Sequence, residues 1–429
     1  MNRYMKIIAG MLMVAIVILL SCTAEGELYE RGNGSVSVIT IATQPTITTN
    51  VTVGSITSTL TVSASVTQSA TLSYQWYNNT MNSNTNGTAI SGATDASFTI
   101  PATLAVGTYY YFCEVSATGG ATPVRTTVAT VNVTAVSLSG VWTKKADFAG
   151  GIRGGAIGFS IGNKGYVGTG GSSDGNNQQD FWEYDPELNR WTQKANFSGG
   201  IRNDAIGFSI GNKGYLGIGD SDGNNFYQDF WEYNPNLNTW TKKANFPGVA
   251  RGSAVGFSIG IKGYIGTGWD GNNELQDFWE YDPDSNIWTK KVNFPGGNRR
   301  LAVGFSIGNK GYVGTGGSSD GNNQQDFWEY DPVFNTWTQK ADLPNGGTAS
   351  AAGFSIGNKG YIGTGYPWSR RDFWEYDPVS NIWTQKVDFA GGGREATVGF
   401  SIGNKGYMGT GFTYDADGPL KQDFWEFTP

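Results

Sequence analysis

Short runs in which apolar and polar residues alternate extend through most of the chain after residue 37. Between residues 37 and 136 these runs cover residues 60–65, 72–77, 97–100, 109–115 and 127–133. Alternation with a period of two is typical of strands that have one buried face. The pairs Asn86-Gly87 and Gly119-Gly120 lie between runs and favour tight turns. The pattern predicts a β-sandwich over residues 37–136.

Residues 141–429 contain six copies of one pattern, which recurs every 46 to 49 residues. Each copy carries one Trp in the phrase Trp-Thr-x-Lys and a second Trp in Asp-Phe-Trp-Glu or a close relative, and segments 158–186 and 304–332 are identical. The first Trp stands at positions 142, 191, 240, 288, 337 and 383, and the second at 182, 231, 279, 328, 374 and 425. A fixed period of this length indicates a repeat architecture with one supersecondary unit per copy.

Each copy divides into four short strands, which in the first full copy cover residues 156–161, 165–170, 180–184 and 191–195. The Gly-rich second strand lets neighbouring sheets approach closely. The region begins with a lone fourth strand at residues 142–147 and ends after a third strand at residues 423–427. Pairing of these ends completes one sheet, whereas a solenoid would leave both unpaired. We therefore predict an all-β protein with a six-bladed β-propeller over residues 141–429, whose last blade is closed by strand 142–147.

Two resemblances support these assignments. The glycines of Gly-Tyr-Val-Gly-Thr-Gly, followed by Tyr-Asp-Pro and Trp-Thr, resemble the kelch repeat, which implies a propeller but no particular activity. In the segment 37–136, residues 74–77 (Tyr-Gln-Trp-Tyr) resemble strand C of bacterial immunoglobulin-like domains, with Trp76 buried. Residues 107–113 resemble strand F, with Tyr111 at the position of the tyrosine corner. No second Cys lies near residues 62–64, so we expect Cys113 to be buried and unpaired.

The first 22 residues have the pattern of a secretion signal. A basic start is followed by an apolar run at residues 7–20, which is short for a membrane span. Residues 19–22 (Leu-Leu-Ser-Cys) resemble the lipobox of bacterial lipoproteins, which implies a lipid on Cys22. Thr23 in place of Asp favours the outer membrane, and residues 23–36 form a polar, flexible tether. An ordinary signal peptide with a chance Cys and a transmembrane anchor remain the alternatives.

Composition excludes several classes of function. The net charge is −7 and the basic residues are not clustered, so we expect no nucleic-acid partner. The chain has no His and two Cys, which excludes Ser-His-Asp and Cys-His catalysis and His-ligated metals. We predict no cofactor and no metal. The Asp-Ser-Asp-Gly-Asn-Asn segment at residues 220–225 resembles a calcium loop in its oxygen ligands, but its spacing does not match, and turns explain it.

A row of arginines is the first candidate for ligand binding. The loops between the second and third strands and between successive copies lie on one face and carry nearly all the sequence variation, which favours recognition there. In five of the six copies an Arg precedes the first strand, and these residues are Arg153, Arg202, Arg251, Arg299 and Arg394. The fifth copy has Thr348 at this position. These guanidinium groups could ring the channel mouth and bind carboxylate or sulfate. The alternative is ion pairing with the Asp that precedes each third strand (residues 180, 229, 277, 326, 372 and 423).

Aromatic residues in the same loops are the second candidate. Trp269 and Asp270 lie in the third copy, Tyr366 and Trp368 in the fifth, and Tyr414 in the sixth. Exposed aromatic rings beside polar groups suit a sugar or a peptide. The alternative is that these rings pack over the channel or on each other.

Together these features predict a monomeric, lipid-anchored protein, exposed at the bacterial outer membrane, that presents its loop face to a glycan or protein partner. The lipid would be its only contact with the membrane. One alternative is an enzyme that acts on acidic sugars, because some kelch propellers are sialic-acid epimerases and six-bladed sialidases carry an arginine cluster. Only the Arg row supports that reading. The other alternative is a structural component of a surface layer or matrix, which the near-identical copies would suit.

Overall fold

A computed structural model describes residues 36–135, 138–172, 175–318, 321–344, 346–367, 369–414 and 419–429. These residues form strands, turns and loops and contain no helix, so none that could cross a membrane. The chain divides into two compact units, Met1–Val136 and Ser137–Pro429. The predicted signal segment, Cys22 and the greater part of the tether lie outside the described residues.

The first unit is built from one larger sheet and two short strand pairs. The larger sheet has the strand order β2 (Thr48–Thr52), β10 (Ala129–Thr134), β8 (Gly107–Ala117), β5 (Leu72–Asn79) and β6 (Thr88–Ala89), and β9 (Val124–Arg125) also pairs with β8. The pairs are β1 (Ile39–Thr43) with β4 (Ser63–Val66) and β3 (Thr59–Thr61) with β7 (Ser97–Thr99). Only the β2–β10 pairing is parallel among these strands.

Trp76 and Cys113 form the centre of this unit. They are cross-strand partners on β5 and β8, and both are fully buried. The indole of Trp76 donates to the carbonyl of Asp95 at 2.9 Å, which satisfies its N–H. Cys113 is free, and burial raises the pKa of its thiol to about 11, so it acts as a small apolar residue.

The predicted tyrosine corner is wrong by two residues. Tyr111 is buried in the core, whereas the hydroxyl of Tyr109 donates to the carbonyl of Ala105 at 3.0 Å. Side chains alternate between the two faces of β8, so both tyrosines point to the same face. Tyr109 lies nearer the start of the strand and reaches the preceding turn.

The second unit contains six four-stranded antiparallel sheets among its described residues, numbered here one to six in chain order. Sheet one consists of β12 (Ile157–Ile161), β13 (Lys164–Gly168), β14 (Phe181–Asp185) and β15 (Arg190–Gln193). Sheet two consists of β16 (Ile206–Ile210), β17 (Lys213–Gly217), β18 (Phe230–Asn234) and β19 (Thr239–Lys242). Sheet three consists of β20 (Val255–Ile259), β21 (Lys262–Gly266), β22 (Phe278–Asp282) and β23 (Ile287–Lys290). Sheets four and five are β24 (Val303–Ile307), β25 (Lys310–Gly314), β26 (Phe327–Asp331) and β27 (Thr336–Lys340); and β28 (Ala352–Ile356), β29 (Lys359–Gly363), β30 (Phe373–Asp377) and β31 (Ile382–Lys386).

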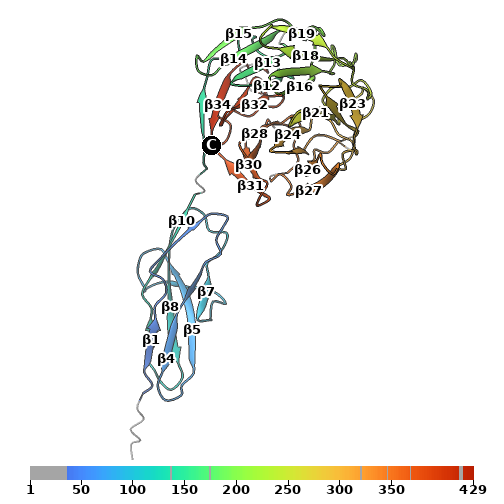
Figure 1. The fold of residues 1–429 in the computed structure, drawn as a ribbon. Coiled ribbons are helices and arrows are strands. Elements are labelled where there is room, and N and C mark those ends of the chain that lie inside the picture. Colours follow the sequence, from blue (N-terminus) through green and yellow to red (C-terminus); the bar gives the residue numbers. More distant parts are fainter. Residues whose placement is uncertain are drawn as a thin grey trace, which may run out of the picture. The chain divides into compact units, whose positions relative to one another are not determined.

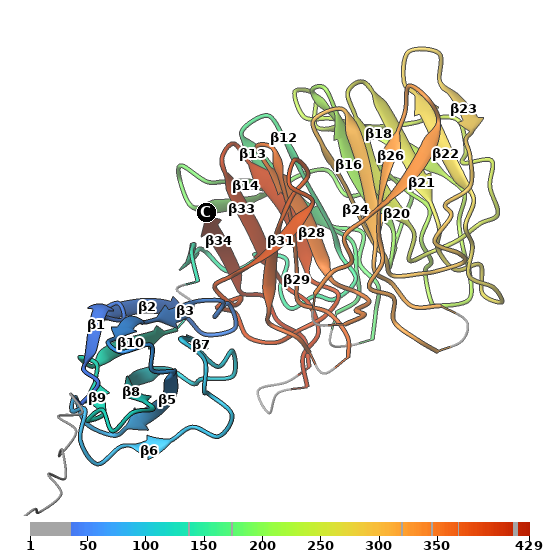
Figure 2. The same cartoon turned by 90° about the horizontal axis from the view of Figure 1, so that it is seen from below.

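Sheet six joins the two ends of the unit. It consists of β32 (Val398–Ile402), β33 (Lys405–Gly409), β34 (Phe424–Thr428) and β11 (Val141–Lys144). Val141 pairs with Thr428 and Trp142 with Phe427, so a strand from the start of the unit completes the sheet formed at its end. The first strands of the sheets contact one another in ring order, and β12 contacts β32 (Figures 1 and 2). Sheets arranged in this way form a β-propeller.

A circle of backbone hydrogen bonds links the six sheets around the axis. One residue of each sheet, just before its first strand, donates its N–H to the carbonyl of the corresponding residue in the preceding sheet, at 2.9 to 3.4 Å. These residues are Gly155, Asp204, Ser253, Leu301, Ser350 and Ala396, and all have positive φ between 50° and 63°. Because five of the six are not glycine, the ring connection outweighs the cost of the left-handed backbone, which is about 1 kcal/mol per residue.

Aromatic rings fill the space between neighbouring sheets. Phe181 of sheet one contacts Tyr233 and Trp240 of sheet two edge to face, with centroids 4.9 and 5.0 Å apart. Glycine on the second strand makes this approach possible, because a Cβ at Gly214 would lie 2.7 Å from the ring of Phe159. The same contacts recur around the ring and fix the positions of the loops.

Candidate functional site

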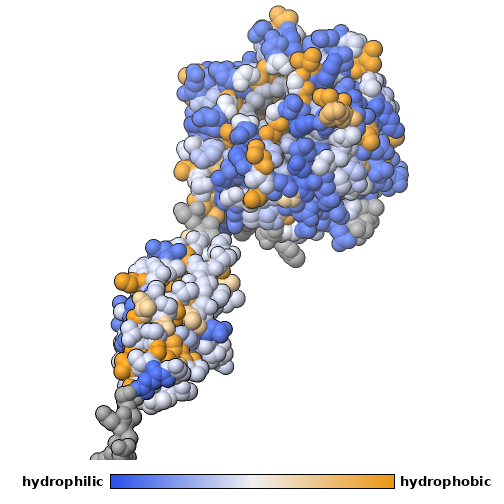
Figure 3. Space-filling model, turned by 60° about the horizontal axis from the view of Figure 1, so that its bottom comes forward, coloured by the Kyte–Doolittle hydropathy of each residue, from blue (hydrophilic) through white to orange (hydrophobic). Residues whose placement is uncertain are grey.

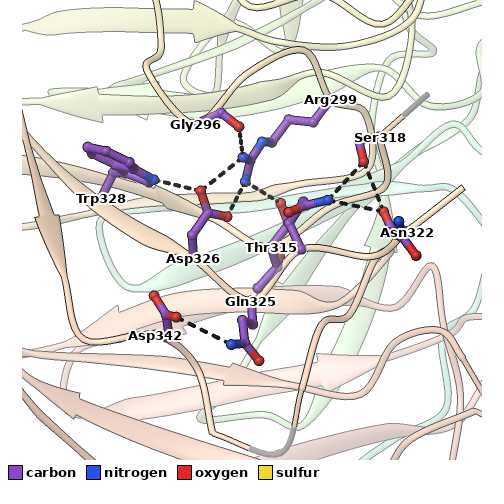
Figure 4. Close-up of polar contacts among 10 residues, drawn as sticks. Gly296, Arg299, Thr315, Ser318, Asn322, Gln325, Asp326, Trp328 and Asp342 are labelled. Atoms are coloured by element: carbon purple, nitrogen blue, oxygen red, sulfur yellow. Dashed lines mark hydrogen bonds and ion pairs between the residues drawn. The ribbon is translucent and has the colours of Figure 1, made fainter. Parts of the chain in front are cut away.

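The arginine row lies in the interior, where each guanidinium is bound by an aspartate. Arg299 donates to both carboxylate oxygens of Asp326, at 2.6 and 3.0 Å, and to the carbonyl of Thr315 at 2.9 Å (Figure 4). A further hydrogen bond joins it to the carbonyl of Gly296, and the indole of Trp328 donates to Asp326 at 2.7 Å. These partners of the pair all belong to the same sheet and its flanking loops.

The other four arginines have the same kind of partner. The ion pairs are Arg153–Asp180, Arg202–Asp229, Arg251–Asp277 and Arg394–Asp423, at 2.5 to 2.7 Å. Burial alone would raise the pKa of Asp277 and of Asp423, but the hydrogen bond and charge of the arginine outweigh it and lower both. In sheet five, Thr348 instead donates to the carbonyl of Tyr366 at 3.0 Å.

The prediction that Arg153, Arg202, Arg251, Arg299 and Arg394 form an open ligand-binding ring is therefore wrong. Their side chains are 0 to 2% exposed. The physical reason is that a desolvated guanidinium is stable only beside a matching carboxylate, and the Asp row supplies one at the same spacing. These pairs fasten the loops to the sheets and leave no positive charge of the row free for an acidic ligand.

The space along the axis is narrow and carries no charge in its inner part. A cavity of about 160 Å³ is lined by small residues from all six sheets, and a second one of about 170 Å³ lies at its mouth. The small residues are Ala156, Ala205, Ala254, Ala302, Ala351 and Thr397. Volumes of this size are below the range of ordinary small-molecule sites.

A larger cavity of about 680 Å³ lies on the loop face and shares Asp204, Ser253 and Leu301 with the cavity at the mouth of the axis. Its lining comes from the loops of sheets one, two and three and from the residues that enter sheets two, three and four. Predicted residue Trp269 lines it, together with Asp204, Asp220, Phe226 and Arg300. A cavity with an aromatic wall and several polar groups is typical of a small-molecule site.

The cavity lies on the face where the repeats differ in sequence. In each repeat, the residue that follows the arginine position pairs with a residue of the loop after the second strand. The six pairs are Gly154–Gly171, Asn203–Asp220, Gly252–Trp269, Arg300–Gly317, Ala349–Tyr366 and Glu395–Phe412. This backbone pairing is thus the same in all six copies, whereas the side chains presented to the loop face differ.

Asp204 and Asp220 carry the acidic chemistry of the cavity. Asp220 is 4% exposed, and one of its oxygens accepts the N–H of Gly223 at 2.5 Å. Asp204 is half-buried and accepts the hydroxyl of Ser253 at 2.7 Å. Burial raises the pKa of both carboxyl groups, and the charges of Asp204 and Asp222 raise that of Asp220 further.

Trp269 and Arg300 form another part of the lining. The guanidinium of Arg300 lies 4.7 Å from the centre of the Trp269 indole, within cation–π distance. A long ion pair of 3.7 Å joins Arg300 to Glu274, and the Arg300 side chain remains 43% exposed. The indole of Trp269 therefore contacts the Arg300 guanidinium and also lines the cavity.

The remaining predicted residues do not line this cavity. Asp270 shapes its own turn by accepting the N–H groups of Asn272 and Asn273, at 2.8 and 2.7 Å. Tyr366 is 46% exposed and Tyr414 is 66% exposed, with the Tyr414 hydroxyl 3.3 Å from Glu395. Trp368 lies outside the described residues.

The loop at residues 220–225 is held by its own side chains. Asp222 accepts the N–H groups of Asn224 and Asn225, at 3.0 and 2.8 Å, which is the geometry of a turn. Across the residues that the structure describes, no group of three or more His, Cys, Asp or Glu side chains could hold a metal ion.

The sequence analysis did not identify several residues of the cavity, among them Asp204, Phe226 and Arg300. Asp204 was missed because it lies two positions after an arginine of the repeated row, and Arg300 because it lies beside Arg299. The signal that could have found Asp204 was the alignment of the six copies, in which its position is Gly, Ser, Leu, Ser and Ala elsewhere.

No protein-family model and no curated protein matches the sequence. The solved structure of YjhT is similar to the chain, with a TM-score of 0.58 and 17% sequence identity. The match covers 66% of this chain and 97% of the other. At this identity the likeness concerns the fold alone, and it supports the conclusion that the repeated part of the chain is a β-propeller.

Proposed function

We propose that this chain is a lipid-anchored binding protein of the bacterial outer membrane, exposed at the cell surface. Its six sheets are the blades of a kelch-type propeller, which an immunoglobulin-like domain and a flexible tether connect to a lipid on Cys22. The loop face binds a glycan or protein partner. The observation that carries this proposal is the cavity of about 680 Å³ on that face, lined by Trp269 and by polar groups of neighbouring sheets.

A monomer fits the surface of the propeller unit. Figure 3 shows one of its faces, on which apolar residues are scattered among hydrophilic ones. Exposed large apolar side chains such as Leu188, Leu237 and Phe334 belong to turns of different sheets. Large contiguous apolar patches are what obligate interfaces require.

The two other functions predicted from the sequence have less support. An enzyme that acts on acidic sugars rested on the Arg row alone, and those guanidinium groups are buried in ion pairs. A purely structural role does not need a cavity on the loop face that is lined by an aromatic ring and several polar groups. We therefore retain binding as the function.

A glycan array tests the proposal. The protein without residues 1–22 is applied to the array and to a panel of secreted proteins, and we expect saturable binding to at least one ligand class. Trp269→Ala should abolish that binding, because it removes the aromatic wall of the cavity. The matched control is Phe334→Ala, which removes an exposed aromatic ring from the turn between β26 and β27 and should leave binding unchanged. Absence of any ligand in both panels would contradict the proposal.

A further inference from the structure

The chemistry of the cavity identifies the class of ligand that it accepts, if the loop face is a binding face as proposed above. Its hydrogen-bonding groups include the carboxylates of Asp204, Asp220 and Asp222, which accept but do not donate when ionised. Asp220, which is 4% exposed, presents a carboxylate with one oxygen bound to the Gly223 N–H. Asp204 adds a second carboxylate, of which one oxygen accepts the Ser253 hydroxyl. A ligand that donates hydrogen bonds, such as one rich in hydroxyl groups, complements such a lining.

The backbone is shaped to bring these groups together. A Cβ at Gly252 would lie 3.3 Å from an oxygen of Asp220 and 3.5 Å from both Asp204 and the ring of Phe226. Glycine at this position therefore leaves room for two carboxylates and an aromatic ring around one point. The corresponding residue of sheet four is Arg300.

The charge of the cavity disfavours an acidic ligand. Among the described residues, the lining contains three carboxylates, those of Asp204, Asp220 and Asp222, and one cation, Arg300. Arg300 is already engaged by Glu274 and by the indole of Trp269. A ligand carboxylate placed here would face like charges in a partly desolvated space, where repulsion is only weakly screened.

Trp269 and Phe226 supply the apolar surface that a sugar ring requires. Both line the cavity on the side of sheets two and three. The C–H groups of a pyranose pack on an aromatic ring while its hydroxyl groups point to polar side chains, which is the combination that the cavity offers.

We propose that the cavity binds an uncharged sugar ring, whose hydroxyl groups donate to Asp204 and Asp220 while its C–H face packs on Trp269. The same carboxylates exclude sugars that carry a carboxylate of their own. The loop face thus selects neutral glycans, in contrast to the acidic sugars that a free arginine ring would have favoured.

Matched oligosaccharides test this selectivity by titration calorimetry. Galacto-oligosaccharides are compared with galacturonate oligosaccharides, and gluco- with glucuronate oligosaccharides, so that each pair differs only in the charged group. We expect the neutral member of at least one pair to bind at least about tenfold more tightly than its acidic counterpart. Equal or tighter binding of the acidic members would overturn the inference.

Isosteric variants assign the selectivity to the cavity. Asp204→Asn and Asp220→Asn retain the shape of the side chains and an acceptor for Ser253 and Gly223, so the fold should persist. Each should weaken neutral binding by about tenfold, and the double variant should narrow the difference between neutral and acidic ligands. Asp284→Asn, in the exposed turn between β22 and β23, is the control.

The outcomes separate this inference from the proposed function. Glycan binding that is insensitive to both Asp variants and to Trp269→Ala would overturn the inference, while the loop face or another surface would still bind. Binding only to proteins would overturn it as well. No binding to any ligand would contradict the proposed function itself.

Discussion

Asp220 is a residue that we assign to ligand binding, because its carboxylate does not stabilise the fold. A repeat needs no carboxylate there, since the corresponding residues are Gly171, Trp269, Gly317, Tyr366 and Phe412. Burial and the neighbouring carboxylates of Asp204 and Asp222 raise its pKa, so the folded state disfavours the ionised form. Residues that cost stability without serving the fold are typical of binding sites.

Replacement of Asp220 by Asn should raise the thermal midpoint of unfolding at pH 7. A raised folded-state pKa means that ionised Asp220 destabilises the fold, and this destabilisation develops as the pH rises through that pKa. Asn removes the charge and still accepts the Gly223 hydrogen bond. Thermal unfolding followed by circular dichroism should show the gain at pH 7 and its loss on acidification. A lower midpoint for the variant at pH 7 would contradict the assignment.

The Arg–Asp pair is the element that holds each loop to its sheet. Arg299 spans the loop at Gly296, the end of β25 at Thr315 and the start of β26 at Asp326 (Figure 4). The same arrangement recurs in sheets one, two, three and six with small differences. Thr348 in sheet five shows that the ring tolerates one sheet without it.

Truncation of Arg299 to Ala should destabilise the protein by about 3–5 kcal/mol, because it leaves Asp326, whose side chain is only 19% exposed, without its cation. Arg371→Ala is the control, since Arg371 pairs with Asp388 at 3.0 Å but is 70% exposed, and its loss should cost less than about 1 kcal/mol. Urea unfolding measures both. Equal free energies of unfolding for Arg299→Ala and the unmodified protein would contradict a structural role for the row.

The sequence predicts the strands better than it predicts where the side chains of the connecting loops point. Alternation, turn residues and the regular Trp spacing give the four strands of each repeat, because each strand buries one face. The same regularity hides the function of the Arg row. Arg and Asp recur at one spacing on one face, so the sequence alone does not distinguish an open ring from a set of ion pairs. Trp269 was identifiable because it departs from the repeat, and it lines the cavity. Asp204 was overlooked because it lies two positions after Arg202, which belongs to the repeated row.

At the scale of the whole propeller, the two ends of the unit depend on each other. β11 pairs with β34, and Trp142 packs edge to face on Phe373 and Phe389 of the neighbouring sheet, with centroids 5.1 and 4.9 Å apart. The backbone circle through Ala396 and Gly155 joins sheets six and one at the axis. Both connections bring residues far apart in sequence together, so the ring should unfold as one cooperative unit.

Trp142→Ala tests this dependence, because it removes a large aromatic side chain from the joint between sheets five and six. We expect destabilisation of about 3 kcal/mol, the lower end of the range for buried aromatic residues, because Trp142 is partly buried. Differential scanning calorimetry should show one lowered transition for the propeller unit. A separate early transition that leaves the main one unchanged would contradict cooperative closure.

The binding claim rests on the cavity between Asp220 and Trp269, and a crystal structure with a neutral oligosaccharide tests it most directly. The account predicts a sugar ring on the loop face, packed on Trp269 with hydroxyl groups within hydrogen-bond distance of Asp204 and Asp220. A ligand bound instead at the loops of sheets five and six, on the opposite face or in the first unit would contradict it.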